Sequence, residues 1–229
     1  MTDPDLISLL ITLRLAAVTT LCLILLGTPL AWFLATSNHI LRNVVEPVVA
    51  LPIVLPPTVV GFYLLISFAP SSLPGALWES MTGSSLAFSF SGLVIGSIIY
   101  SLPFYVQPLQ VAFSNLRHEL IEAAATLGAG PFDLFLNLIV PLCRRGFIIA
   151  ICLSFAHTVG EFGIVLMIGG NLPEETRVLS IALFDHVEAL DYERAHLLAG
   201  GLLTFAFVTL FILYSLDRHW RKPLLGEDR

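Results

Sequence analysis

Long apolar stretches alternate with short polar segments along the chain. Five stretches are long enough to cross the membrane, since a helix needs roughly 20 apolar residues to span about 30 Å of hydrocarbon. The stretches run from about Leu6 to Leu34, Val48 to Ala69, Leu86 to Phe113, Gly146 to Ile168 and Leu197 to Leu216. The pattern therefore predicts an all-α membrane protein, a polytopic helical bundle of about five transmembrane helices, with residues 1–229 forming one domain.

Two of the segments outside these spans are short. The apolar run from Val178 to Phe184 is too short to span, so we expect an interfacial or re-entrant piece. The segment from Pro70 to Ser85 is rich in Pro, Gly and Ser, which predicts a turn-rich loop.

The long segment from Ser114 to Arg145 is strongly patterned. Apolar residues recur every three or four positions from Leu116 to Leu127, which predicts a short amphipathic helix. Gly128-Ala129-Gly130-Pro131 ends it, and Pro131 suits the first turn of a second helix that Pro141 closes or bends into the next span. Such a helix pair is typical either of an amphipathic loop on the membrane interface or of a docking element for a soluble partner.

Composition and charge support the membrane assignment. Hydrophobic residues make up 56% of the chain and charged residues only 12%, about half the share of a soluble domain. The net charge of -6 comes with no basic stripe, so nucleic acid is not an expected partner. The three cysteines, Cys22, Cys143 and Cys152, lie in or beside spans without paired spacing, which argues against a disulfide or a metal site.

The basic residues predict the orientation. Positively charged loops stay in the cytoplasm. If the C-terminus is cytoplasmic, eight of the eleven Lys and Arg residues lie on that side, and only Arg177 and Arg194 lie outside. We therefore expect the N-terminus outside, where the acidic segment from Met1 to Asp5 is retained, and the C-terminus inside.

Polar residues in the fourth span are candidates for function. His157 and Glu161 are four residues apart, which places them on one face of a helix. A carboxylate at mid-membrane costs roughly 2.5–3.5 kcal/mol, so Glu161 should face the bundle interior, water or a partner. The pair is either a structural hydrogen-bonded link or a gate beside a path, together with Thr158 and the flexible Gly160 and Gly163. A metal site lacks ligands here, and a proton relay would indicate a secondary carrier.

Prolines in the second span permit two interpretations. Pro52, Pro56 and Pro57 remove backbone donors and should kink the helix. The kink serves packing alone, or Pro56, Pro57, Thr58 and Gly61 form a hinge that lines a pore, with Thr58 as a hydroxyl donor. In the third span the same alternatives apply to four residues, Pro103, Gln107, Pro108 and Gln110.

The segment from Ser114 to Arg145 resembles a known motif. Glu122-Ala123-Ala124, three residues, Gly128, nine residues and then Leu138-Ile139-Val140-Pro141 are similar to the EAA loop of ABC importer permeases. In that family the loop is a coupling helix in a cleft of the cytoplasmic ATPase. The resemblance implies that this chain contacts an ATPase through Glu122, Ala123, Ala124, Gly128 and Pro141.

A wider resemblance points to the molybdate branch of these permeases, which have a type I, MetI-like fold. It rests on three segments, which are ALPIVLPPTVVGFYLL from Ala50, SLPFYVQPLQVAF from Ser101 and the stretch from Phe155 to Leu190. The resemblance implies ATP-driven molybdate import across a bacterial or archaeal plasma (inner) membrane, with a cytoplasmic ABC ATPase and an extracytoplasmic molybdate-binding protein as partners. Val140 and Glu174 depart from the family pattern, and Glu174 leaves the geometry of the outer turn open.

ATP chemistry must come from another chain. A phosphate-binding loop needs Gly-x4-Gly-Lys and then Ser or Thr, whereas the single lysine, Lys222, lies between Arg221 and Pro223. We therefore expect neither catalytic residues nor a cofactor. We expect a homodimer in lipid, because five helices are few for a path.

Three rival functions remain open. Tungstate or sulfate import differs only in the anion. An ion-coupled carrier would typically need inverted repeats, which are not found. An intramembrane enzyme lacks a nucleophile paired with a base.

Overall fold

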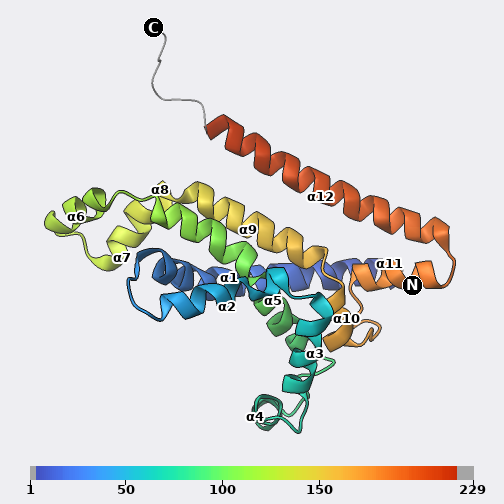
Figure 1. The fold of residues 1–229 in the computed structure, drawn as a ribbon. Coiled ribbons are helices and arrows are strands. Elements are labelled where there is room, and N and C mark those ends of the chain that lie inside the picture. The colour runs from blue at the N-terminus through green and yellow to red at the C-terminus, as the bar shows by residue number, and fades with distance from the viewer. Residues whose placement is uncertain (1–3, 221–229) are drawn as a thin grey trace.

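The computed structural model describes residues 4–220, whose regular structure is helical (Figure 1). The helices are α1 (Pro4–Thr36), α2 (Arg42–Val54), α3 (Pro57–Phe68), α4 (Leu73–Thr82), α5 (Phe90–Ser114), α6 (His118–Thr126), α7 (Pro131–Asp133), the π-helix η1 (Leu134–Ile139), α8 (Val140–Leu142), α9 (Arg144–Val159), α10 (Gly163–Gly169), α11 (Leu179–Glu188) and α12 (Tyr192–Trp220). Four charged residues used in the predicted orientation lie outside the described residues: Asp3, Arg221, Lys222 and Arg229.

The helices that can cross a membrane agree with the predicted number of spans. By length and composition, α1, α5 and the part of α12 from Tyr192 to Ser215 each qualify alone. Two bent pairs qualify together, α2 with α3 at 114° and Pro131–Leu142 with α9 at 76°. The described residues therefore hold three spanning helices, or up to five if each bent pair is one span.

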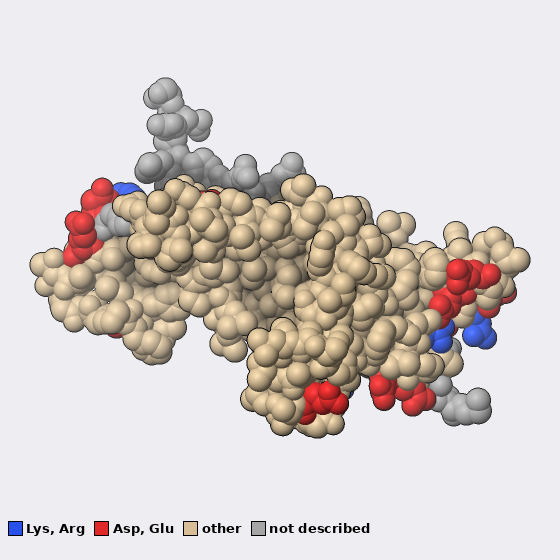
Figure 2. Space-filling model, turned by 60° about the horizontal axis from the view of Figure 1, so that its bottom comes forward, with Lys and Arg blue, Asp and Glu red and all other residues tan. Residues whose placement is uncertain are grey.

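The long helices run between two ends of the molecule. In Figure 1 the N-terminus and α11 lie at one end, whereas α6 and α7 lie at the other. Figure 2 shows charged side chains gathered toward the ends and edges of the visible face, with a broad uncharged area between them. This distribution is what a membrane-spanning bundle requires.

The contact between α1 and α5 forms the centre of the bundle. Gly27 allows the helices to approach closely, because a Cβ atom there would lie 2.6 Å from Cδ1 of Tyr105. Tyr105 is fully buried, and its hydroxyl shares a hydrogen bond of 2.9 Å with Thr28. Burying an aromatic ring together with its polar atom fixes the crossing point of the two helices.

One predicted loop is wrong. The segment from Pro70 to Ser85 contains the ten-residue helix α4. Ser72 caps it, since its hydroxyl oxygen accepts a hydrogen bond of 3.1 Å from the backbone N–H of Gly75, and Pro74 occupies the first turn. Residues that are typical of turns therefore begin a helix here.

The short apolar run after the fourth predicted span is helical. Its residues from Leu179 to Phe184 lie in α11, which extends to Glu188, and Val178 is the N-cap. The N-terminal end of α11 is attached to α1, because the backbone N–H of Leu179 donates a hydrogen bond of 2.7 Å to the Thr12 hydroxyl. At the same end of the molecule, His186 lies 3.0 Å from the carboxylate of Asp5.

Candidate functional site

The second predicted span is broken at its tandem prolines. Helix α2 ends at Val54, and Leu55 and Pro56 are both extended, with ψ of 138°. A residue before proline is pushed out of the helical region, and here two successive residues precede a proline. Helix α3 then starts at Pro57 after a bend of 114°, so the predicted kink is a complete break.

The fourth predicted span is also broken. Helix α9 ends at Val159, and α10 begins at Gly163. Glu161 lies between them, so the prediction that His157 and Glu161 share one helix face is wrong. Gly160 is the C-cap of α9, with a φ of -86°.

The two broken spans meet at their breaks. A Cβ atom on Gly163 would lie 2.8 Å from Cβ of Pro57, and one on Gly61 would lie 2.9 Å from Cβ of Met167. Glycine at both positions therefore lets α3 and α10 pack with their backbones close together. Four predicted site residues, Pro56, Pro57, Gly61 and Gly163, thus come together at one crossing.

A small hydrogen-bonded network lies at the end of α9. The Ser101 hydroxyl of α5 is 2.9 Å from Nδ1 of His157 and 3.0 Å from the hydroxyl of Thr158. The His157 ring stacks on Phe104, with ring centroids 3.9 Å apart. His157 and Thr158 therefore tie the last turn of α9 to the continuous helix α5.

Glu161 has an unusual environment. Its side chain is buried, and neither carboxyl oxygen has a hydrogen-bond partner among the described residues. The Ser97 hydroxyl of α5 lies near the carboxyl group, but it also makes no hydrogen bond with a described residue. The backbone carbonyl of Glu161 instead accepts a bond of 2.5 Å from the Ser180 hydroxyl of α11. The break thus holds an unpaired acid inside the bundle, which is rare and costly in a membrane.

The remaining predicted path residues lie on the outside of the chain. Thr58 and Gly160 are exposed, as are Pro56 and Pro57. Thr58 is thus not brought together with the buried network around His157. Its exposed hydroxyl belongs to the surface of a single chain.

Sequence reasoning missed Ser97 and Ser101, which face the break from α5. They are four residues apart and so lie on one helix face. Small hydroxyl residues are common in spans, so this spacing was a weak signal. Only the contact with His157 and Glu161 identifies them.

The segment that resembles the EAA loop, α6 to α8, is called the coupling segment below. Glu122 and Ala123 are exposed on α6, Ala124 is half-buried, and Leu127 is 89% exposed despite being apolar. Gly128 has a φ of 91°, and a Cβ atom there would meet nothing within 4 Å. The segment lies at the end of the bundle (Figure 1), and its small residues Ala123 and Gly128 are exposed.

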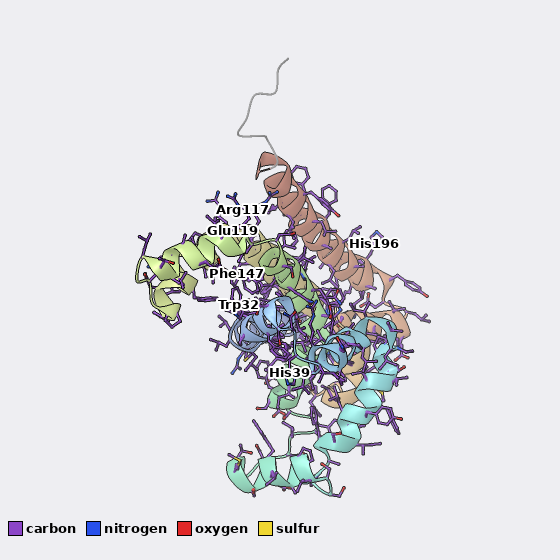
Figure 3. All side chains as sticks on the ribbon, turned by 60° about the vertical axis from the view of Figure 1, so that its left-hand side comes forward. Trp32, His39, Arg117, Glu119, Phe147 and His196 are labelled. Carbon is purple, nitrogen blue, oxygen red and sulfur yellow. The ribbon has the colours of Figure 1, made fainter. Side chains whose placement is uncertain are left out.

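Pro141 does not itself make the bend into α9. It lies in the first turn of α8, and the chain bends by 76° at Cys143, two residues later. Beside this bend Phe113 packs against both Trp32 and Phe147, with centroids 5.2 and 5.8 Å apart; the latter two are labelled in Figure 3. These rings fasten α1, α5 and α9 together next to the coupling segment.

Comparison with known proteins gives a consistent result over nearly the whole chain. Residues 27–222 match a family described as the binding-protein-dependent transport system inner membrane component. The molybdenum transport system permease protein ModB of Azotobacter vinelandii is 52% identical over 95% of this chain and 96% of that protein. ModB of Escherichia coli K12 is 32% identical over 82% of each chain. The sulfate transport system permease protein CysT of Synechocystis is 31% identical over 86% of this chain and 68% of its own.

A solved structure shares the fold. It is a bacterial alginate ABC transporter in complex with an alginate pentasaccharide-bound periplasmic protein. The match covers 97% of this chain and 81% of that chain with a TM-score of 0.75 at 16% identity. The predicted fold class is therefore confirmed.

Proposed function

The chain belongs to the family of binding-protein-dependent transport system inner membrane components, and on that premise we propose that it is the permease of an ATP-driven molybdate importer. The 52% identity to a molybdenum permease over almost the full length carries this assignment. A sulfate permease shares 31% identity, and the match covers only 68% of that protein. Sulfate is therefore the second candidate, and tungstate resembles molybdate too closely for these residues to separate them.

The coupling segment is the proposed contact with a cytoplasmic ABC ATPase. Glu122, Ala123 and Ala124 form its small-residue surface, and Gly128 turns the chain with a positive φ that other residues rarely adopt. The bend at Cys143, just after Pro141, joins this surface directly to α9.

Alternating access follows from this connection. Closure of the ATPase would move the coupling segment, and α9 would carry that movement to the break at Gly160, Glu161 and Phe162. Helix α10, which starts directly after the break, lies against Pro57 and Gly61 of the other broken span. At a helix break the continuous backbone hydrogen bonds are already interrupted. The two halves can therefore change their angle without breaking further ones, so this crossing is suited to act as the gate.

The path itself requires a second copy of the chain. Thr58 is exposed on a single chain, so its hydroxyl would reach a substrate only if another surface faces it. A homodimer with a two-fold axis is the common way to close such a path. Glu161 would repel a dianion, so its proposed role is in the gate rather than in binding.

The N-terminus is proposed to lie outside and the C-terminus in the cytoplasm. The contact of Asp5 with His186 and the ion pair of Arg177 with Asp185, at 2.9 Å, lie at the end away from the coupling segment. An extracytoplasmic binding protein would deliver the anion at that end. Selectivity would then rest mainly on the binding protein.

The decisive experiment measures ATP hydrolysis in liposomes that contain this chain and its ATPase. Binding protein loaded with molybdate, tungstate or sulfate is added in turn. Stimulation by molybdate with matching uptake is expected. Stimulation by sulfate alone would reassign the substrate, and pH-driven uptake without ATP would replace the importer by an ion-coupled carrier.

A further inference from the structure

A cavity of about 580 Å³ lies between α5, α9 and the coupling segment, at the start of α6. Two arginine residues are among those that line it, Arg117 at the start of α6 and Arg145 in the first turn of α9. Apolar side chains, including Leu142 and Ile149, make up much of the remaining wall. Arg117 is labelled in Figure 3.

The charged and apolar parts of this cavity lie at different depths. Arg117 follows the end of α5 at Ser114, whereas Pro108 lies six residues inside that helix. At about 1.5 Å per residue this separation is about 9 Å along the helix axis. Ile149 is likewise about 6 Å further along α9 than Arg145. The cavity is therefore cationic at the helix ends and apolar toward the middle of the bundle.

Two other cavities lack this combination. One of about 710 Å³ lies between α1 and the coupling segment and is lined by apolar residues and Thr28. Another of about 340 Å³ contains Glu46, whose carboxylate accepts a hydrogen bond of 2.9 Å from Gln110. Of these three cavities, the one at Arg117 is the one with arginine residues in its wall.

We propose that this cavity binds an anionic phospholipid, with its phosphate at Arg117 and Arg145 and an acyl chain against Pro108 and Ile149. Basic pockets between spanning helices are suited to anionic headgroups. A guanidinium has five N–H donors, so it can bind a phosphate oxygen while keeping a contact within the chain. The bound lipid would hold the start of α6 against α5 and α9.

The binding test is independent of transport. The chain is purified with its ATPase in mild detergent and exposed to equimolar phosphatidylglycerol and phosphatidylcholine. Native mass spectrometry then identifies the lipid that the complex retains. Phosphatidylglycerol should be retained preferentially. Each of Arg117→Gln and Arg145→Gln should lower its retention about fivefold, since one basic side chain near an anionic headgroup contributes roughly that factor.

The matched control is Arg144→Gln, which removes the same charge next to Arg145 but does not line the cavity. It should retain the lipid like the parent. Leu142→Trp supplies a second test without a charge change, because Leu142 is 50% exposed and a larger ring there would fill the cavity. Equal loss of phosphatidylglycerol from Arg144→Gln, or its full retention by Leu142→Trp, would show that the lipid does not bind in this cavity.

Two further outcomes decide the source of the phosphate and its role. Displacement of the lipid by millimolar inorganic phosphate would show that the cavity binds a free anion instead. In nanodiscs, the two arginine variants should lower stimulated ATP hydrolysis only when phosphatidylglycerol is present. The same loss in pure phosphatidylcholine would mean that the arginines contact the ATPase, and the lipid role would be wrong. Failure of molybdate uptake would leave the retention result standing, so the two proposals are separable.

Discussion

The continuous helices α1 and α5 and the broken spans that meet at α3 and α10 contain similar residues but behave differently. Helix α1 runs through Pro29, and α5 runs through Pro103 and Pro108. The second span breaks at Pro56 and Pro57. An isolated proline removes one donor and is absorbed by a small adjustment, whereas two in succession force two neighbouring residues out of the helical region.

Glycine also serves the two regions differently. Gly27 brings α1 against a fully buried tyrosine that is hydrogen-bonded to the same helix, so this contact is fixed. Gly61 and Gly163 bring two helix breaks together next to an acid without a hydrogen bond. Under the proposed gating mechanism, α1 and α5 therefore form the rigid scaffold, and the crossing of α3 and α10 is the movable part.

The largest expected effect lies at the coupling segment, which is proposed to drive the movable crossing. Gly128→Asp should abolish most uptake, because a residue with a Cβ atom at a φ of 91° costs about 1–2 kcal/mol and adds a charge to the docking surface. The bundle should still fold, since a Cβ atom there meets nothing within 4 Å. Uptake and ATP hydrolysis in liposomes measure the uncoupling.

Gly130→Asp is the matched control for that change. Gly130 has an ordinary φ of -72°, and its Cβ position is also open. The variant carries the same charge without the strained backbone, so it should keep most of the coupling. Unchanged uptake by Gly128→Asp would count against docking at this turn.

A substitution at the movable crossing should affect transport more than folding. Gly163→Val would press on Pro57. Overpacking costs about 1–3 kcal/mol, and strain of that size in one of two conformations shifts their balance about 5- to 150-fold. We expect uptake to fall about tenfold with little change in thermal unfolding. Ala17→Val, on the exposed face of α1, is the control. A lower unfolding temperature with unchanged uptake would show that the crossing is merely structural.

The opposite result is expected at the scaffold. Gly27→Leu would push into the Tyr105 ring and should destabilise the fold by about 1–3 kcal/mol. Thermal unfolding in detergent measures this loss, and Ala17→Leu on the same helix is the control. Normal stability with reduced uptake would reverse the assignment of rigid and movable regions.

The hydrogen bonds that link α5 to the end of α9 should contribute less to stability. Ser101→Ala removes the hydroxyl that contacts His157 and Thr158. The Thr158 hydroxyl keeps its hydrogen bond of 2.9 Å to the Ser154 carbonyl, so mainly Nδ1 of His157 loses a partner, and we expect a loss of about 1 kcal/mol. Ser154→Ala is a buried control whose hydroxyl bonds only carbonyl groups of its own helix, among them Ala150 at 2.8 Å. Equal unfolding temperatures for both variants would remove the proposed link.

The smallest effect is expected at Glu161. Its carboxyl oxygens have no hydrogen bond within the described chain, so Glu161→Gln should keep ATP-driven uptake within about twofold of the parent. An ion-coupled carrier would need the ionisable group and would lose transport completely. Parent uptake that runs on a pH gradient without ATP and is lost in Glu161→Gln would reopen the carrier hypothesis.

Much of the fold could be predicted because a membrane imposes simple requirements. Spans from Leu6 to Leu34 and from Leu197 to Leu216 correspond to α1 and α12, since hydrocarbon demands about 20 apolar residues in a hydrogen-bonded helix. Helix α4 was missed because Ser and Pro favour both turns and helix starts, and only the contact of Ser72 with Gly75 decides between them.

The candidate site could be predicted only in part. Tandem prolines made the break at Pro56 and Pro57 predictable, because their effect on the backbone is local. The break after Val159 was not, since glycine permits either a helix or its end.

By itself the sequence predicted the membrane environment and the helical spans, because both follow from local composition and spacing. The coupling segment and the separate ATPase were predicted from a family resemblance and stay proposals. Only the tertiary structure decided that Pro57 meets Gly163 and that Ser101 holds His157 and Thr158. It alone left Glu161 buried without a hydrogen bond. These features depend on contacts between residues far apart in the chain, and hydrophobic burial, which selects the helices, is too nondirectional to specify which side chains meet.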